Sequence, residues 1–295
     1  MASAELRDTR RRIKSVQSTM KITRAMELIA ASRIPKATGR VKSSKPYSSK
    51  LVEVIRNVSS ASGGATHMLL ERRDVKTAGV LCVASDRGLA GAYASSIIRE
   101  TERKLLEYEH AGINTRLFVV GKKAQTYFAY RKYHIERAFL GVTDTPGYGD
   151  ARAIANSLMD SYASGSVDSV DAFYTQFVSA LTQAPRQYQL LPITPPAGSG
   201  ETTSSTVDYA YEPSPAGILS RLLPRYVEAT VFSMLLEASA SEHSARRRAM
   251  KAATENAEEL IRVLSRIANR ARQAEITTEI SEIVGGAEAL TAQSS

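Results

Sequence analysis

The chain has 295 residues, of which 43% are hydrophobic, and this composition excludes an intrinsically disordered protein. Its net charge is +9, and residues 1–56 contain fourteen Lys or Arg against four Asp or Glu. Such a basic segment suits nucleic acid, anionic lipid or an acidic protein surface, and composition does not choose among them. The single cysteine, Cys82, excludes an internal disulfide and a cysteine-built zinc site.

Neither a membrane span nor a cleaved presequence is expected. No apolar run is long enough to cross a bilayer. The N-terminus is arginine-rich, but Glu5 and Asp8 lie within it and a helical pattern begins almost at once.

Residues 3–34 predict an amphipathic helix with basic residues between its apolar positions. Pro35 and Pro46 are expected to kink or interrupt the helix beyond residue 34. Helical spacing resumes at residues 51–58 and ends at Gly63 and Gly64. The first part has the alternating three- and four-residue spacing of a coiled-coil seam at Leu6, Thr9, Ile13, Val16, Met20 and Thr23.

The middle of the chain predicts strands that alternate with helices, a pattern typical of a mainly parallel sheet covered on both faces. Residues 195–215, rich in Pro, Gly, Ser and Thr, predict a long loop. The predicted strands are 78–84, 115–120, 170–179 and 186–193, the last as a hairpin partner, and the predicted helices are 93–109, 122–131 and 151–163.

A long helix is predicted from Arg225 to Val284, because no proline or glycine interrupts this segment. It would be on the order of 90 Å long, so it needs a partner along its length. The N-terminal helix supplies one by antiparallel packing, with the remainder from roughly Leu260 onward left for other chains. The fold class is therefore α/β, with a long antiparallel coiled coil of the terminal helices and an inserted Rossmann-like α/β domain. The expected segments are 1–62, 63–216 and 217–295.

The segment from Ser85 to Tyr93 lies between a predicted strand and a helix, where phosphate-binding loops occur. It lacks the Gly-Lys-Ser/Thr ending and has only Gly88 and Gly91 of a dinucleotide fingerprint. We expect Asp86 to cap the helix rather than admit phosphate. A structural turn is favoured, and no bound cofactor or metal is expected.

No arrangement of side chains indicates a catalyst. Ser241 to Ser244 contains a serine near a histidine, but on a predicted continuous helix, where no nucleophile elbow forms. The basic helix lacks interleaved aromatic residues, and no recognised nucleic-acid motif appears. The histidines have no metal-ligand spacing; they are His67, His110, His134 and His243.

Both terminal segments resemble the gamma subunit of F-type ATP synthases of the bacterial type. The N-terminal motif of that family is similar to Lys21–Ser32, and its C-terminal signature to residues 241–246, 249–257 and 271–287. The turn at 85–89 and the Tyr-Glu-Pro of 211–213 also match, in the same order along the chain.

The resemblance implies a central-stalk rotor shaft that transmits c-ring rotation to the catalytic beta subunits, coupling proton flow to ATP synthesis. The chain itself would be a non-catalytic subunit without cofactor or nucleotide. Its partners would be three alpha and three beta subunits, the epsilon subunit and the c-ring. It would be peripheral, at the cytoplasmic face of a bacterial cell membrane, touching the membrane only through the c-ring.

The resemblance also assigns contact residues by position. A foot toward the c-ring and epsilon subunit would include Tyr209, Tyr211 and Glu212. Pro35 departs from the unbroken helix of the family, and the chloroplast-type insert with two cysteines is absent. The implied beta-subunit contacts are Met26, Arg246, Gln273, Thr277 and Glu279.

Two other function classes remain open from the residues alone. One is a free-standing coiled-coil adaptor or a basic nucleic-acid-binding protein, which would not assemble with alpha and beta subunits. The other is an α/β enzyme that uses the turn at residues 85–93, which predicts saturable nucleotide binding by the isolated chain.

Overall fold

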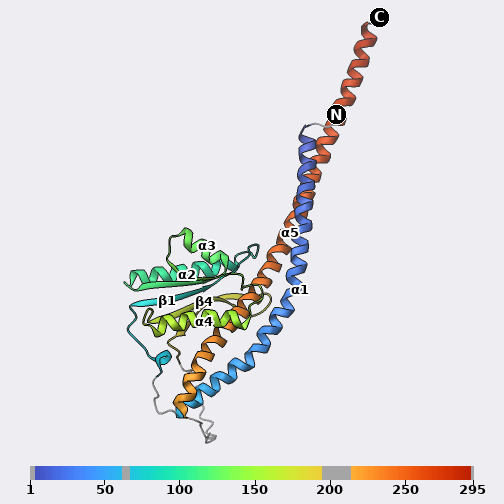
Figure 1. Cartoon of the computed structure of the whole chain (residues 1–295). Helices are drawn as coiled ribbons and strands as arrows, with labels where there is room; N and C mark the ends of the chain where they lie inside the picture. Colours follow the sequence, from blue (N-terminus) through green and yellow to red (C-terminus); the bar gives the residue numbers. More distant parts are fainter. Residues whose placement is uncertain (1–3, 62–66, 195–213, 294–295) are drawn as a thin grey trace. The chain divides into compact units, whose positions relative to one another are not determined.

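A computed structural model describes residues 4–61, 67–194 and 214–293, which form two compact units (Figure 1). The first, here the helical unit, comprises residues 1–29 and 247–295, and the second, here the α/β unit, comprises residues 30–246. Helices α1 (Ala4–Ala61) and α5 (Pro215–Gln293) contribute to both.

The α/β unit is built on a five-stranded sheet in the order β3-β2-β1-β4-β5. The first four strands are parallel, and β5 is antiparallel to β4, as the predicted hairpin requires. The strands are β1 (Thr77–Val83), β2 (Asn114–Val120), β3 (Ile135–Phe139), β4 (Ser169–Phe177) and β5 (Gln183–Leu191).

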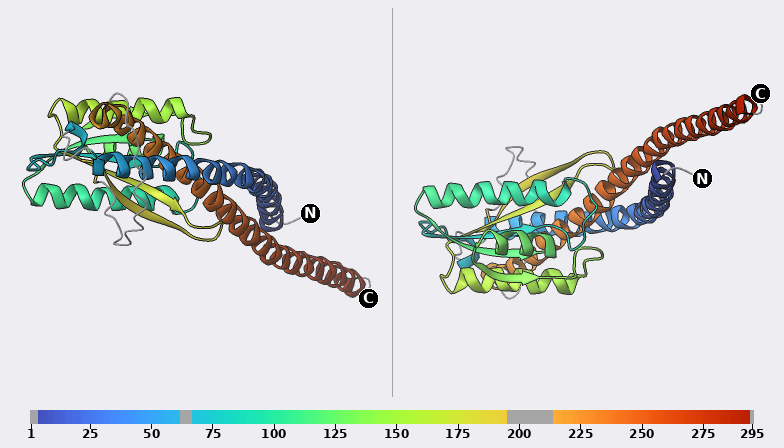
Figure 2. Two further views of the ribbon diagram at one scale, coloured as in Figure 1. Left: turned by 90° about the horizontal axis from the view of Figure 1, so that it is seen from below. Right: turned by 90° about the horizontal axis from the view of Figure 1, so that it is seen from above.

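Helices cover both faces of this sheet, as Figure 2 shows. One face packs on α2 (Tyr93–His110) and α3 (Lys122–Tyr130). The other packs on α4 (Tyr148–Ala163) and on parts of α1 and α5 within this unit. A short 3-10 helix, η1 (Met68–Leu70), adds Leu69 to that second core. Because β1 lies centrally, its side chains are almost fully buried, and Cys82 packs there as predicted.

The predicted interruption of the N-terminal helix is wrong, since α1 continues through both Pro35 and Pro46. Each proline lies on an exposed position, so its ring clashes with no core residue. On both sides of Pro35 the helix is held to the unit by packing of Ala30 and Val41. The packing therefore outweighs the backbone hydrogen bond that a proline cannot donate.

Helix α5 is longer than the predicted segment of 225–284 at both ends. Its first turns continue through Pro224 because Leu219, Leu223 and Val227 are buried against the sheet. Beyond Val284 it passes through Gly285 and Gly286. The predicted break at Gly63–Gly64 and the predicted loop up to residue 213 lie outside the described residues.

Candidate functional site

The helical unit pairs the first part of α1 with the last part of α5 in antiparallel directions (Figure 1). Thr23 and Thr254 share a hydrogen bond of 2.8 Å between their hydroxyls. Leu6 and Thr9 are buried, and the other predicted seam positions are less exposed than their neighbours. The seam therefore forms at the positions that the spacing predicts. On α5 it extends to the buried Ala268, beyond the predicted end of the paired region near Leu260.

The basic residues of α1 point away from this seam. Arg7, Arg10, Lys14 and Lys21 are exposed. Asp8 bonds to the nearby Arg11 at 2.6 Å, within the same helix. An exposed row of cations on a paired helix can attract an acidic partner, but each exposed pair contributes little free energy.

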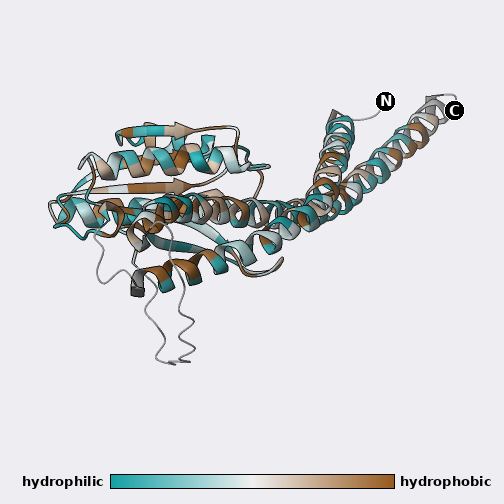
Figure 3. Ribbon diagram, turned by 60° about the horizontal axis from the view of Figure 1, so that its bottom comes forward, coloured by the Kyte–Doolittle hydropathy of each residue, from teal (hydrophilic) through white to brown (hydrophobic). Residues whose placement is uncertain are grey.

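The end of α5 is an exposed helix with large apolar side chains, here the apolar tip: Ile276, Ile280, Ile283 and Val284 are 43%, 57%, 72% and 52% exposed. Figure 3 shows apolar positions continuing between polar ones along this end of the helix. Exposed apolar side chains that gather on one segment indicate a surface that another chain covers.

Four of the five expected beta-contact residues lie in the helical unit. Met26 is half-buried, whereas Gln273, Thr277 and Glu279 are exposed on the last part of α5. The Thr277 hydroxyl donates to the Gln273 carbonyl oxygen at 2.9 Å, so it is directed back along its own helix. The expected foot residues Tyr209, Tyr211 and Glu212 lie outside the described residues.

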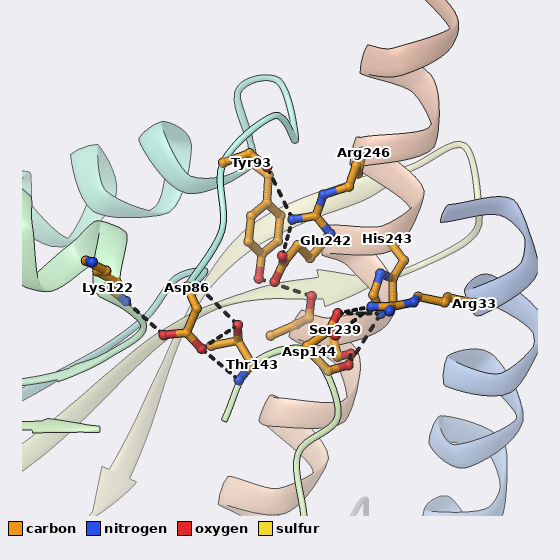
Figure 4. A network of polar contacts seen from close by, with 12 residues as sticks. Arg33, Asp86, Tyr93, Lys122, Thr143, Asp144, Ser239, Glu242, His243 and Arg246 are labelled. Atoms are coloured by element: carbon orange, nitrogen blue, oxygen red, sulfur yellow. Dashed lines mark hydrogen bonds and ion pairs between the residues drawn. The ribbon is translucent and has the colours of Figure 1, made fainter. Parts of the chain in front are cut away.

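Arg246, the fifth of these residues, lies in the α/β unit and is buried there (Figure 4). Its guanidinium contacts the Glu242 carboxylate at 2.5 Å and donates to the Gly88 carbonyl oxygen at 3.3 Å. Burial raises the pKa of Glu242 despite the opposing charge of Arg246. The hydrogen bond of Arg246 to Gly88 therefore connects α5 to the loop between β1 and α2.

A contact of α1 with the loop between β3 and α4 centres on Asp144 (Figure 4). Arg33 reaches its carboxylate at 2.5 Å, and the Ser239 hydroxyl donates to its backbone carbonyl oxygen at 3.0 Å. Burial raises the pKa of Asp144, but the hydrogen bond and charge of Arg33 outweigh it, so the net pKa lies below the usual value. The buried His243 lies beside this group, and desolvation lowers its pKa.

Asp86 was expected to cap the helix that follows its own loop, α2, and this is wrong. Its carboxylate instead accepts from the Lys122 N–H at the start of α3 and from the Thr143 N–H and hydroxyl (Figure 4). Gly121 permits the approach, because its φ is +95° and a Cβ there would lie 2.7 Å from the Ser85 carbonyl carbon. The N-cap of α2 is Ala92, which provides no side-chain cap.

These networks join elements and do not assemble a recognisable catalytic group. Within the described residues, no three His, Cys, Asp or Glu side chains are placed to hold a metal ion. The same ranges contain no helix both long and apolar enough to span a bilayer.

Sequence reasoning missed Arg33 and Asp144, which are 111 positions apart and share no motif. The pair Glu242 and Arg246 carried a usable signal, since a carboxylate four residues before an arginine forms an ion pair on a helix. The further hydrogen bond of Arg246 to the Gly88 carbonyl oxygen, however, comes from a distant loop that no local pattern indicates.

Known proteins match this chain over nearly its whole length. The family model described as ATP synthase matches residues 5–290. The ATP synthase gamma chain of Acidothermus cellulolyticus is 47% identical over 99% of both chains, and that of Kineococcus radiotolerans is 46% identical over 99% of both. The gamma chain of Desulforamulus reducens is 43% identical and is covered completely.

Solved structures share the fold at lower identity. A chain of the mitochondrial ATP synthase of Euglena gracilis matches with a TM-score of 0.70 at 16% identity, covering 98% of this chain and 96% of its own. A chain from the central stalk and c-ring structure of Tetrahymena thermophila matches with a TM-score of 0.60 at 23% identity, covering 79% of this chain and 99% of its own. With the full-length relatives, these findings place the chain in the ATP synthase gamma-chain family.

Proposed function

We propose that this chain is the central-stalk rotor shaft of a proton-driven F-type ATP synthase in a bacterium. It transmits rotation of the c-ring to the catalytic beta subunits and does no chemistry itself. The observation that carries the proposal is the match to bacterial gamma chains along the whole length, combined with a helical unit whose apolar tip is exposed.

The helical unit suits this task physically. A two-stranded seam stiffens the shaft, and the apolar tip can turn within a surrounding apolar sleeve without fixed polar partners. Each face of the shaft then stabilises a different state of a beta subunit, so rotation shifts their populations in turn. Weak exposed charge pairs allow contacts to form and break in every turn.

The proposed partners are three alpha and three beta subunits, the epsilon subunit and the c-ring. Met26, Gln273, Thr277 and Glu279 would contact beta subunits, and Arg246 is retained among these contacts by position, although its guanidinium is bonded within the α/β unit. The c-ring and epsilon foot would use Tyr209, Tyr211 and Glu212. The chain would be peripheral, at the cytoplasmic face of the cell membrane.

Co-purification and turnover test the proposal. The native complex should contain alpha and beta subunits in equal numbers with one copy of this chain, and removing the chain should abolish ATP-driven proton pumping. A chain that native-mass analysis finds monomeric, or bound to nucleic acid only, would support the adaptor or nucleic-acid alternative and exclude the rotor.

A further inference from the structure

The last part of α5 extends beyond its partner helix within the helical unit. The last buried residue of the seam on α5 is Ala268, and no residue from 269 to 287, here the end segment, is buried. Only Ala271 and Glu275 are half-buried there. Figure 1 shows α5 continuing past the start of α1. Among the described residues, no buried core therefore stabilises the helix of the end segment.

The amino-acid composition of the end segment disfavours an isolated helix. Nine of the twelve residues from 276 to 287 have low helix propensity, and most are β-branched or glycine, which lose the most conformational freedom in a helix. An exposed helix of this length is marginal in water even when it is rich in alanine. The nine residues are Ile276, Thr277, Thr278, Ile280, Ser281, Ile283, Val284, Gly285 and Gly286.

The charges of the end segment weaken its helix further. Glu275, Glu279 and Glu282 follow one another at spacings of four and three residues. Side chains at these spacings are neighbours on a helix surface, so the three carboxylates repel one another.

The paired part of the same helix has the opposite composition. Nine of the twelve residues from 251 to 262 are Ala, Leu, Lys, Arg or Glu, which have high helix propensity. Lys251 forms an ion pair with Glu255 at 3.7 Å, and the buried Thr254 bonds to Thr23 across the seam at 2.8 Å. Helix propensity therefore falls along α5 where the apolar side chains become exposed.

We propose that the end segment folds on assembly. In the chain alone its helix forms only part of the time, and it becomes fully helical when partner subunits enclose the apolar tip. Enclosure buries Ile276, Ile280 and Ile283, and the free energy of burying them offsets the entropy lost in ordering the helix. The partner is the sleeve of alpha and beta subunits, so this step rests on the rotor function proposed above.

The paired part of α5 makes such folding efficient. Starting a helix is unfavourable, whereas extending an existing helix adds one hydrogen bond for each residue that is fixed. The seam with α1, which extends to Ala268, supplies a stable helix end from which the end segment is extended inside the sleeve. The folding step therefore proceeds from the seam toward the apolar tip.

Amide hydrogen exchange tests this on the full-length chain, alone and in the complex with alpha and beta subunits. In the chain alone, the amides of residues 276–284 should exchange within about ten-fold of the rate of an unstructured peptide, and those of residues 251–262 at least about a hundred-fold more slowly. In the complex, exchange at residues 276–284 should slow by about a hundred-fold or more. Equally slow exchange of both ranges in the chain alone would overturn the proposal.

A pair of glycine variants tests the cause. In the chain alone, Gly285→Ala combined with Gly286→Ala should slow exchange at residues 276–284 by about five-fold or more, because alanine costs less entropy in a helix. A Cβ at either position meets no atom within 4 Å, so neither substitution creates a clash. Gly39→Ala, on α1 and equally open, should leave exchange at residues 276–284 unchanged. Unchanged exchange in the double variant would contradict a helix limited by its propensity.

The measurements separate the folding step from the rotor function. Slow exchange of the end segment in the chain alone overturns the folding step even where the chain assembles with alpha and beta subunits. Fast exchange that persists in the assembled complex also overturns it, since enclosure then does not order the helix. A chain that does not assemble with these subunits overturns the rotor function, and with it the proposed partner of the end segment.

Discussion

The guanidinium of Arg246 satisfies a carboxylate that has almost no access to water. The Glu242 side chain is 2% exposed, and its Oε2 has no hydrogen-bond partner, so removing the guanidinium leaves a buried charge without compensation. We expect Arg246→Ala to lower the free energy of unfolding by about 3 kcal/mol. Arg247→Ala, at an exposed position, should change it by less than about 0.5 kcal/mol. Urea unfolding of the full chain at pH 7 measures both.

A second comparison separates a structural role of Arg246 from a partner contact. The double variant Glu242→Leu with Arg246→Met should recover most of the lost stability, because neither charge is then buried. If Arg246→Ala is as stable as the wild type but binds the beta subunits more weakly, the guanidinium instead contacts the partner.

The Asp144 carboxylate makes stability depend on acidity. Because the folded pKa lies below the unfolded one, its stabilisation is present above about pH 4 and is lost as pH falls through the folded pKa. Asp144→Asn should cost about 1 kcal/mol at pH 7, since the side chain is partly exposed, and the difference from wild type should shrink in acid. Urea midpoints from pH 7 to pH 3 test this. A difference independent of pH would contradict it, and Arg33→Gln should reproduce the loss.

At the scale of single residues, the sequence predicted what depends on neighbours along the chain. The seam from Leu6 to Thr23 and the buried Cys82 follow from local spacing. The ion pair of Arg33 with Asp144 and the direction of Asp86 depend on tertiary geometry that no local pattern contains.

Among the elements, α1 contains a proline that the helix tolerates at a cost. Pro35 cannot donate to the Ala31 carbonyl, and its position is exposed, so replacing it should restore a hydrogen bond without disturbing the core. We expect Pro35→Ala to raise the free energy of unfolding by about 1–3 kcal/mol. Thermal unfolding of the full chain measures it, and Pro46→Ala, at a second exposed position within the same helix, should stabilise the chain in the same direction. A loss of stability would show that the proline sets a required bend.

The strands were predictable in proportion to their burial. β1 and β2 are apolar runs and were located within one residue. β3 was missed, because the edge strand Ile135–Phe139 contains two central charged residues, Glu136 and Arg137, and is too short for a periodic signal. The predicted start of α5 is late because a proline such as Pro224 favours a helix boundary, whereas burial of Leu219 and Leu223 holds the helix together across it.

For the whole molecule, the apolar tip permits a graded truncation. Removing residues 285–295 should leave assembly and coupling intact, since Ile276, Ile280 and Ile283 remain. Removing the chain back to about Gln273 deletes these exposed side chains and should weaken coupling. The ratio of ATP-driven proton pumping to ATP hydrolysis, measured in the same vesicles, reports the coupling. Equal coupling in both truncations would exclude a bearing role for the tip.

The two helical segments of the helical unit are far apart in the sequence, and this has a consequence for biosynthesis. Residues 4–29 leave the ribosome before the α/β unit, whereas their partner segment begins at residue 247, after that unit. At about 5–20 residues per second, the first helix waits on the order of ten seconds or more with its seam unpaired. Since a single amphipathic helix is marginal in water, this segment is a natural client for a nascent-chain chaperone until its partner on α5 has been translated.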